Sequence, residues 1–172
     1  MHTSIYPPSD DTFFLMDVLQ KELGDGRGKH ALDMGTGSGV IAEFLRNMGY
    51  VVVGADINPH AVEYCRKKYP DIDFRVSDLF SNIPERFDLI VFNTPYLPGK
   101  AKTLEERGWC SENGEIHRRF FAELPTHIKD GGICYVLLSS HTPYSPPKKL
   151  KYEVVARKKL FFEEIYVLKI KF

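Results

Sequence analysis

The segment LIVFNTPYLPG, residues 89–99, places an amide, a hydroxyl, a proline and an aromatic ring directly after an apolar run. The apolar run predicts a buried strand that ends at Asn93. A planar NH2 group is a poor nucleophile, because its nitrogen lone pair is delocalised into the neighbouring π-system. The side-chain oxygen of Asn93 and the carbonyl of Thr94 can accept its two N–H hydrogens, while Tyr96 stacks on its plane. We therefore expect this segment to hold a flat NH2 group during group transfer.

A second set of chemically useful residues is DMGTGSG, residues 33–39. Its glycines permit a tight turn and let backbone N–H groups approach a ligand at a helix N-terminus. Dinucleotide-binding turns space their glycines as GxGxxG, whereas this turn reads GxGxG, with Val40 at the third dinucleotide position. Asp33 precedes the turn and suits a positively charged amino group, which a pyrophosphate lacks. The pattern favours a cationic nucleoside over a dinucleotide.

Two further acids end the next two predicted strands. Asp56 is placed to accept both hydroxyls of a ribose, and Asp78 lies where an adenine amino group is expected, with Leu79 packing on the ring. Three acids at successive strand ends around one glycine turn indicate a cationic nucleoside rather than a phosphate. Two alternatives remain open: the acids only cap helices and the turns are ordinary α/β turns, or the chain is a dehydrogenase. For residues 93–96 alone, an ordinary turn is also open.

The elements that must position these residues alternate along the chain. The patterns predict helices over residues 12–22, 40–48, 59–69 and 115–127, the first capped by Asp11 or Thr12 and the third by Asn58. They predict strands over residues 30–34, 51–57, 72–76, 87–93 and 132–139, and two more over 152–156 and 164–172. Apolar strands that alternate with helices indicate a parallel sheet covered on both faces, and the last two strands indicate an antiparallel hairpin at one edge. The fold class is α/β: a Rossmann-like class I methyltransferase sheet.

The composition sets the broad class. The 172 residues predict a single domain over 1–172, with an N-terminal entrance segment and helix over 1–24 and the terminal hairpin over 152–172. Lysines plus arginines equal aspartates plus glutamates at 23 each, so no net field recruits nucleic acid or an anionic membrane. The three cysteines form no CxxC pair and the histidines show no metal-ligand spacing, so we expect neither a disulfide framework nor a metal site. Without a signal region or a membrane-length apolar run, a soluble cytoplasmic protein is expected.

Together, residues 33–39, Asp56 and residues 93–96 resemble the HemK-type protein N5-glutamine methyltransferases, which modify the glutamine of the GGQ loop in release factors. The family tetrapeptide is NPPY, which adenine-N6 DNA and RNA methyltransferases also use. YPPSDDT, residues 6–12, is similar to the YEPAEDT entrance of the short archaeal and eukaryotic branch. Residues 109–121 and 131–139 follow that branch too, so the resemblance covers nearly the whole chain.

The resemblance implies the roles of individual residues and the partners. Asn93, Pro95 and Tyr96 would hold the substrate amide, with no metal. S-adenosyl-L-methionine would be held by Thr12, Asp33, Gly35, Gly37, Asp56, Asp78, Leu79 and Asn93. The short branch works with a small zinc-binding activator protein that pairs with a sheet edge, so a protein substrate and such an activator are the expected partners.

Two departures from the family pattern affect this expectation. Thr94 replaces the first proline, so the loop is expected to lose rigidity, although the proposed contact is a backbone carbonyl. The segment after Trp109 is shorter than the glycine-rich family version, which bears on the substrate more than on the reaction. Two alternatives to glutamine methylation stay open: methylation of an exocyclic amine of adenine or guanine in RNA or DNA, and a non-catalytic cofactor-binding scaffold.

Two surface segments, a polar loop and a group of basic residues, have more than one interpretation. The segment of residues 98–114 is long and polar and carries the only tryptophan. It is expected to be either a substrate lid or a surface loop with one packed aromatic side chain. Several basic residues gather near the terminal hairpin, where a solvated face is favoured over an RNA contact. These are Lys148, Lys149, Lys151, Arg157, Lys158 and Lys159.

Overall fold

The computed structural model describes residues 7–95, 97–98, 110–111, 114–142 and 144–172. Its helices are α1 (Asp10–Glu22), α2 (Val40–Asn47), α3 (Pro59–Lys68) and α4 (Glu115–His127). Its strands are β1 (His30–Met34), β2 (Val51–Asp56), β3 (Asp73–Val76), β4 (Phe87–Asn93), β5 (Leu97–Pro98), β6 (Cys110–Ser111), β7 (Ile128–Ser139), β8 (Tyr152–Lys159) and β9 (Glu164–Lys171). Among the described residues, no helix is long and apolar enough to cross a membrane.

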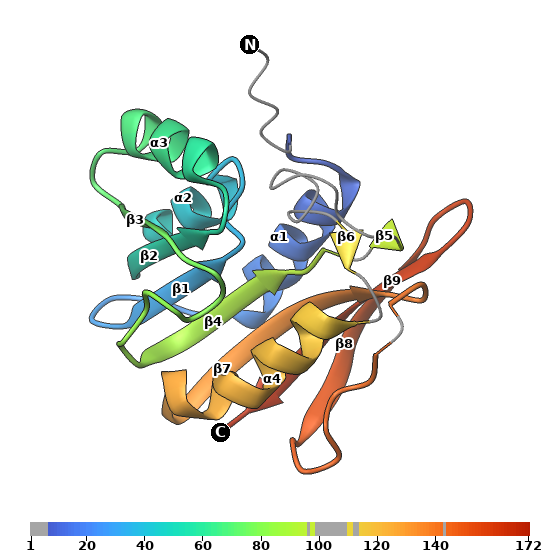
Figure 1. Ribbon diagram of the computed structural model, residues 1–172. Coiled ribbons are helices and arrows are strands. Elements are labelled where there is room, and N and C mark those ends of the chain that lie inside the picture. The colour runs from blue at the N-terminus through green and yellow to red at the C-terminus, as the bar shows by residue number, and fades with distance from the viewer. Residues whose placement is uncertain (1–6, 96, 99–109, 112–113, 143) are drawn as a thin grey trace.

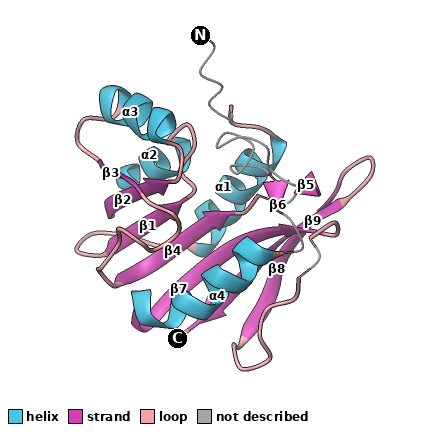
Figure 2. Ribbon diagram, in the orientation of Figure 1, coloured by secondary structure: helices cyan, strands magenta, loops and turns pink. Residues whose placement is uncertain are grey.

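Seven strands form one sheet in the order β3-β2-β1-β4-β7-β9-β8 (Figures 1 and 2). The first five of these pair in parallel, while β9 pairs antiparallel with both β7 and β8. This is the mostly parallel class I methyltransferase sheet with a C-terminal antiparallel hairpin that the sequence predicts. β5 and β6 form a separate two-stranded pair.

Each face of the sheet has its own apolar core. Helices α1, α2 and α3 cover one face, where Leu89 and Val91 of β4 pack with side chains such as Leu45. Helix α4 covers the other face, where Ile90 and Phe92 join its aromatic side chains. Because successive strand residues point to opposite faces, both of which are buried, β4 reads as a continuous apolar run.

Three element boundaries differ from the sequence prediction by at least two residues. Strand β7 begins at Ile128, four residues before its predicted start. Helix α1 begins at Asp10 with Ser9 as its N-cap, because Ser9 has extended backbone angles and its N–H donates to the Thr12 hydroxyl at 3.5 Å. Strand β8 continues three residues beyond the predicted end and pairs residues 157–159 with β9. The Arg157 guanidinium contributes to this extension by an ion pair with Glu164 at 2.7 Å.

The expected basic cluster near the hairpin is divided between its two ends. Lys148, Lys149 and Lys151 precede β8, whereas residues 157–159 lie at its far end, next to the turn into β9. At about 3.3 Å per residue, the six steps from Lys151 to Arg157 separate the two groups by roughly 20 Å. The six charges therefore do not form one continuous patch.

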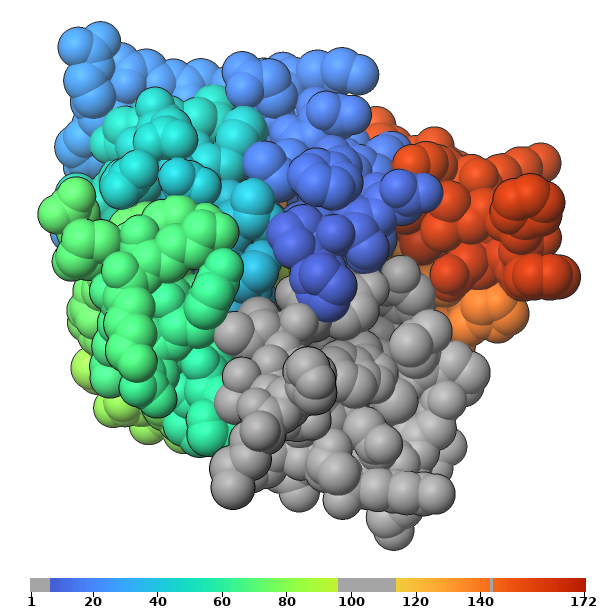
Figure 3. Space-filling view, turned by 90° about the horizontal axis from the view of Figure 1, so that it is seen from above, coloured from blue at the N-terminus to red at the C-terminus, as the bar shows by residue number. Residues whose placement is uncertain are grey.

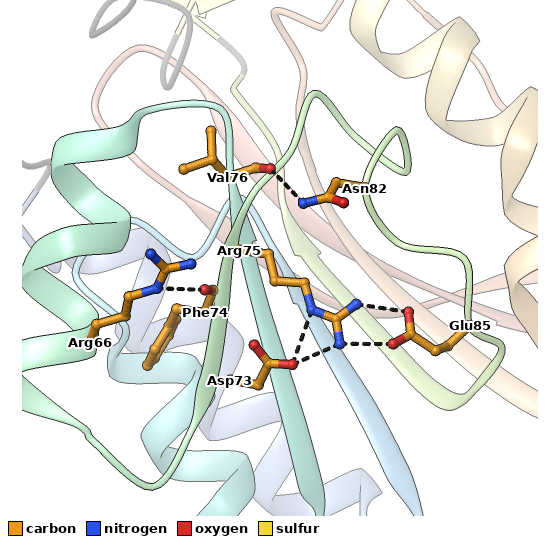
Figure 4. Close-up of polar contacts among 7 residues, drawn as sticks. All are labelled: Arg66, Asp73, Phe74, Arg75, Val76, Asn82 and Glu85. Atoms are coloured by element: carbon orange, nitrogen blue, oxygen red, sulfur yellow. Dashed lines mark hydrogen bonds and ion pairs between the residues drawn. The ribbon is translucent and has the colours of Figure 1, made fainter.

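Strand β3 lies at one edge of the sheet, and side chains satisfy part of its backbone (Figure 4). The Nε of Arg66 donates to the carbonyl of Phe74 at 2.9 Å, and the Nδ2 of Asn82 donates to that of Val76 at 3.3 Å. The guanidinium of Arg75 forms ion pairs with Asp73 and Glu85, each at 2.7 Å. The chain thus protects this edge from uncontrolled strand pairing.

Candidate functional site

The predicted site residues meet at one edge of the sheet. Asp33, Asp56 and Asn93 lie at the carboxyl ends of β1, β2 and β4, and Asp78 follows β3. Parallel strands bring these ends together at the edge where open α/β sheets bind ligands. The N-terminal part of α1 (blue) lies over the same edge, between the first βα units and the terminal hairpin (Figure 3).

The glycine turn between β1 and α2 needs the backbone freedom of glycine. Gly35 and Gly37 have φ values of 67° and 51°, which side-chain-bearing residues rarely adopt. A Cβ on Gly35 would lie 3.2 Å from a ring carbon of Phe92, so the turn passes close to β4. The Gly37 N–H donates to Asp56 Oδ2 at 2.9 Å, which joins the turn to the end of β2.

Asp33 is a buried acid with unused hydrogen-bonding capacity. It is 1% exposed, and its Oδ2 accepts a 2.6 Å hydrogen bond from the Thr36 hydroxyl. Burial raises the Asp33 pKa to about 7, against the opposing effects of Thr36 and the Ala42 backbone N–H. Its Oδ1 is buried and makes no hydrogen bond of ordinary geometry within the described part of the chain. Such an oxygen is suited to a cationic donor.

Asp56 is fixed by backbone groups on both sides. Its Oδ2 faces Gly37, and its Oδ1 accepts the Asn58 N–H at 2.8 Å. Burial raises the pKa of this carboxyl, although the backbone hydrogen bonds from Asn58 and Gly37 act against the shift. Each carboxylate oxygen keeps a further lone pair after accepting one hydrogen bond, so Asp56 can still accept from ligand hydroxyls.

Asp78 differs from the other two acids. Its side chain is 42% exposed and forms an ion pair with Arg119 of α4 at 3.0 Å. The next residue, Leu79, is 4% exposed and has a φ of 49°, an uncommon left-handed conformation for leucine. Leu79 packs in the core beneath α4, together with Phe80 and Phe92. The Asp78 side chain is thus directed towards α4, and the Leu79 side chain is inserted into the core between α4 and the sheet.

Asn93 is oriented by the first turn of α1. Its Nδ2 lies 3.3 Å from Asp11 Oδ2 and 3.4 Å from the Thr12 hydroxyl. An ionised carboxylate only accepts hydrogen bonds, so the NH2 half of the amide must face Asp11. The Oδ1 half is buried, and no described residue gives it a hydrogen bond. The Asn93 side chain therefore keeps an acceptor oxygen that no described residue occupies.

The residues after Asn93 are partly described. Thr94 is 3% exposed, and its hydroxyl donates to the Leu137 carbonyl of β7 at 2.7 Å. The expected loss of rigidity at Thr94 is therefore offset by a side-chain bond that proline cannot make. Pro95 is buried. Tyr96 and Trp109, and with them the predicted ring stacking and the lid, lie outside the described residues.

Sequence reasoning did not assign three residues that shape this site. Asp11 was expected to cap a helix, yet it is 4% exposed and faces Asn93. Thr36 fixes Asp33, and the Cys65 thiol donates to the Gly37 carbonyl at 3.3 Å beneath the turn. Thr36 lies inside the glycine-rich turn of residues 33–39, so the sequence alone could have indicated that its hydroxyl contacts Asp33. Asp11 and Cys65 reach the site through packing, which no local pattern records.

The donor set fits a nucleoside that carries a positive charge better than a metal ion. Asp33 and Asn93 each present a buried oxygen that lacks a hydrogen bond from the described residues, as a ligand with N–H donors requires. Within the described ranges, no group of three or more histidines, cysteines, aspartates or glutamates is placed to hold a metal.

Comparisons with known proteins agree with this geometry. Residues 10–162 match the model of the methyltransferase small domain family. A protein of Methanocaldococcus jannaschii with the provisional name of protein N5-glutamine methyltransferase is 35% identical, covering 98% of this chain and 92% of its own length.

Solved structures extend the agreement to the fold. The E. cuniculi Mtq2-Trm112 complex, responsible for methylation of the eRF1 translation termination factor, superposes with a TM-score of 0.73 at 28% identity, covering 96% of this chain and 97% of that one. The Thermus thermophilus 16S rRNA N2 G1207 methyltransferase, solved with AdoMet and guanosine, gives a TM-score of 0.76 at 23% identity over 98% of this chain and 44% of that one. The second likeness concerns the fold alone.

Proposed function

The chain belongs to the methyltransferase small domain family, and we propose that it methylates the side-chain amide of a glutamine in a peptide release factor. It is an S-adenosylmethionine-dependent methyltransferase. The observation that carries the substrate proposal is the buried Oδ1 of Asn93 at the exit of β4, to which no residue in the described part of the chain donates a hydrogen bond. The names of the M. jannaschii relative and of the E. cuniculi complex support glutamine and a release factor.

On the cofactor side, S-adenosylmethionine supplies, when bound, an electrophilic methyl group on its sulfonium. We propose that the ionised Asp33 carboxylate binds the amino group and that Asp56 accepts from the ribose hydroxyls. The burial of both carboxylates supports this, since a buried acid gains most from an added donor. The full set proposed to hold the cofactor is Thr12, Asp33, Gly35, Gly37, Asp56, Asp78, Leu79 and Asn93.

On the acceptor side, Asn93 Oδ1 accepts one N–H hydrogen of the substrate amide and the Thr94 carbonyl accepts the other. These two acceptors draw electron density towards the nitrogen as positive charge develops on it. Asp11 holds the Asn93 amide in the required orientation, and the Thr94 hydroxyl ties the loop to β7. Pro95 and Tyr96 complete the proposed clamp. Positioning of this kind contributes up to about 7–11 kcal/mol in favourable cases.

No strong base is needed in this arrangement. As the nitrogen gains the methyl group, the methyl–sulfur bond would break and leave its electron pair on sulfur. The positively charged amide would then release one N–H proton to water, and the two carbonyl acceptors orient the amide without keeping the proton. Among the groups that contact Asn93, the Asp11 carboxylate is directed at its NH2 half rather than at the acceptor oxygen. Asp11 therefore orients the amide.

Methyl transfer from labelled cofactor tests the substrate proposal. The purified chain is incubated with labelled S-adenosylmethionine and either a release factor that contains a GGQ loop or structured RNA. The proposal predicts label in the release factor, which disappears when the loop glutamine is changed to glutamate. Label confined to RNA would select methylation of an exocyclic amine instead.

We also propose a small partner protein at a sheet edge, supported by the name of the Mtq2-Trm112 complex. Of the two edges of the described sheet, β3 has carbonyls that accept from Arg66 and Asn82 (Figure 4). These two hydrogen bonds protect the edge, and a partner strand at β3 would have to displace them, so Arg66→Ala with Asn82→Ala is expected to leave such binding intact or strengthen it. Pull-down of the double variant measures this, and weaker capture would count against pairing at β3.

A further inference from the structure

The tip of the β8–β9 hairpin carries two aromatic rings in water. Phe161 and Phe162 are 100% and 90% exposed, and their ring centroids lie 6.4 Å apart. Single exposed apolar side chains are common, whereas two adjacent phenyl rings at one projecting tip forgo much hydrophobic burial. Such a pair is typical of a surface that another molecule covers.

The turn that carries these rings is anchored to the rest of the molecule. The Leu160 N–H donates to the Glu163 carbonyl at 2.8 Å, and Leu160 packs against the core beneath α1. His141 Nε2 lies 2.8 Å from the Phe162 carbonyl, and the Ser139 hydroxyl donates to the Glu163 carboxylate. The backbone is therefore fixed while the rings project, which lowers the entropy cost of binding a partner.

The tip lies on the same edge of the sheet as Asn93. Asn93 is opposite Leu137 on β7, Leu137 is opposite Val167 on β9, and β9 runs from there back to the tip. Two strand spacings and five residues along β9 place the tip within roughly 20 Å of Asn93. The space-filling view shows the hairpin (red) projecting beside the N-terminal part of α1 (Figure 3).

A shallow groove lies between the tip and the start of α1. It has a volume of about 670 Å³ and is lined by Asp10, Lys159, Leu160, Phe161, Phe162 and Glu163. Asp10 precedes Asp11, the residue that contacts Asn93, so one turn of α1 borders both the groove and the site. The groove's two carboxylates outnumber its one ammonium, and this balance disfavours the phosphate backbone of a nucleic acid.

We propose that Phe161 and Phe162 dock the protein substrate, through an apolar patch flanked by a basic side chain on the domain that carries the methylated glutamine. This inference rests on the proposed function, and it adds the surface by which the substrate is selected. The basic side chain would meet Asp10 and Glu163. A distance near 20 Å corresponds to about six extended residues, so a short loop peptide cannot reach the tip from Asn93.

The double variant Phe161→Ser/Phe162→Ser tests the proposal, with Tyr152→Ser at the opposite end of β8 as the matched control. Tyr152 is 43% exposed and the two phenylalanine side chains are almost fully exposed, so neither variant opens the core. Each protein is assayed with a complete release factor and with a peptide that contains the glutamine and two residues on each side. We expect the double variant to raise KM for the complete factor at least tenfold, with kcat unchanged. Its rates on the peptide and the KM of the control should match wild type.

An unchanged KM for the complete factor would overturn the proposal, as would an equal loss on the short peptide. Binding of a fluorescent release-factor domain, measured by anisotropy, covers the case of slow turnover. There too the double variant should bind at least tenfold more weakly, and equal binding would overturn the docking role. If the wild-type chain neither binds nor methylates the factor but methylates RNA, the proposed function itself fails, and this outcome is distinct from the loss of docking alone.

Discussion

The two halves of the site are built in different ways. On the cofactor side, the groups that hold the acids lie within about 20 residues of them in sequence: Thr36 holds Asp33, and Asn58 and Gly37 hold Asp56. On the acceptor side, Asn93 is held by Asp11 and Thr12, more than 80 residues away, and Thr94 by Leu137, 43 residues away. The cofactor half is thus encoded locally, whereas the acceptor half depends on tertiary contacts between α1, β4 and β7.

The largest expected effect is at Asn93. Changing Asn93 to alanine removes the acceptor oxygen that we propose for the substrate amide, and loss of one such group typically lowers kcat by about 10²–10³-fold. The affinity for S-adenosylmethionine should change by less than about threefold, because the other residues proposed to hold the cofactor, Asp33 and Asp56 among them, are unchanged. Steady-state kinetics and calorimetric titration measure the two effects. Near wild-type turnover in this variant would show that Asn93 has no part in the mechanism, and the difference drawn between the cofactor side and the acceptor side would then fail.

The reverse result is expected at Asp33. Changing Asp33 to asparagine removes a charged partner of the cofactor's amino group, and a hydrogen bond to a charged group contributes about 1.5–3 kcal/mol. Affinity for S-adenosylmethionine should therefore fall by roughly 10–100-fold, with a much smaller change in kcat at saturating cofactor. Calorimetric titration gives the affinity. A loss in kcat without a loss in affinity would place Asp33 on the acceptor side.

The buried Asp33 also predicts a pH dependence of cofactor binding. Its pKa, raised by burial to about 7, means that the free enzyme must lose a proton before it offers a carboxylate to a cation. Cofactor affinity should weaken by about tenfold between pH 8 and pH 6. Asp33→Asn should bind with little change over this range, and an equally steep profile in that variant would assign the titration to another group.

The same pKa predicts the pH dependence of stability. The folded state binds the Asp33 proton more tightly than the unfolded chain does. The contribution of this bound proton to the free energy of unfolding is therefore fully present below the usual pKa of 3.8 and is lost as pH rises through about 7. Asp33→Asn should therefore gain stability over wild type at pH 8, by at most about 4 kcal/mol. Urea denaturation at pH 5 and pH 8 measures this difference, and a larger gain at pH 5 would contradict it.

A smaller effect is expected at Asp11, which acts through Asn93. Changing Asp11 to asparagine keeps the shape but no longer forces the NH2 half of the Asn93 amide towards α1. We expect kcat to fall by about 3–10-fold, since a hydrogen bond contributes about 0.5–1.5 kcal/mol. KM for the substrate should change little. An unchanged kcat in Asp11→Asn would mean that packing alone orients Asn93.

The smallest effect is expected at Thr94. Changing Thr94 to valine keeps its volume and removes the hydrogen bond to Leu137, which should lower the free energy of unfolding by about 1–2 kcal/mol. Turnover should fall only a few-fold, because the proposed contact with substrate is a backbone carbonyl. Thermal denaturation and initial rates report the two changes. If stability is unchanged, the hydroxyl is not what fixes the loop.

The difference between the cofactor side and the acceptor side also explains which features could be predicted from the sequence. The glycine turn, the Asn58 cap and the alternation of strands and helices are local patterns, and the structure places the sheet as they predict. The role of Asp11 was missed because it depends on α1 lying across the end of β4, and sequence spacing carries no such information. The end of β8 was misplaced for a related reason: residues 157–159 look polar, and only pairing with β9 makes them a strand.

Locating the transferred methyl group tests the central claim most directly. A release factor treated with the enzyme and S-adenosylmethionine is digested, and its peptides are fragmented in a mass spectrometer. We predict one added methyl on the side-chain amide of the loop glutamine with wild-type enzyme, and none with Asn93→Ala at equal cofactor occupancy. A methyl on any other residue, or full methylation by Asn93→Ala, would contradict the account.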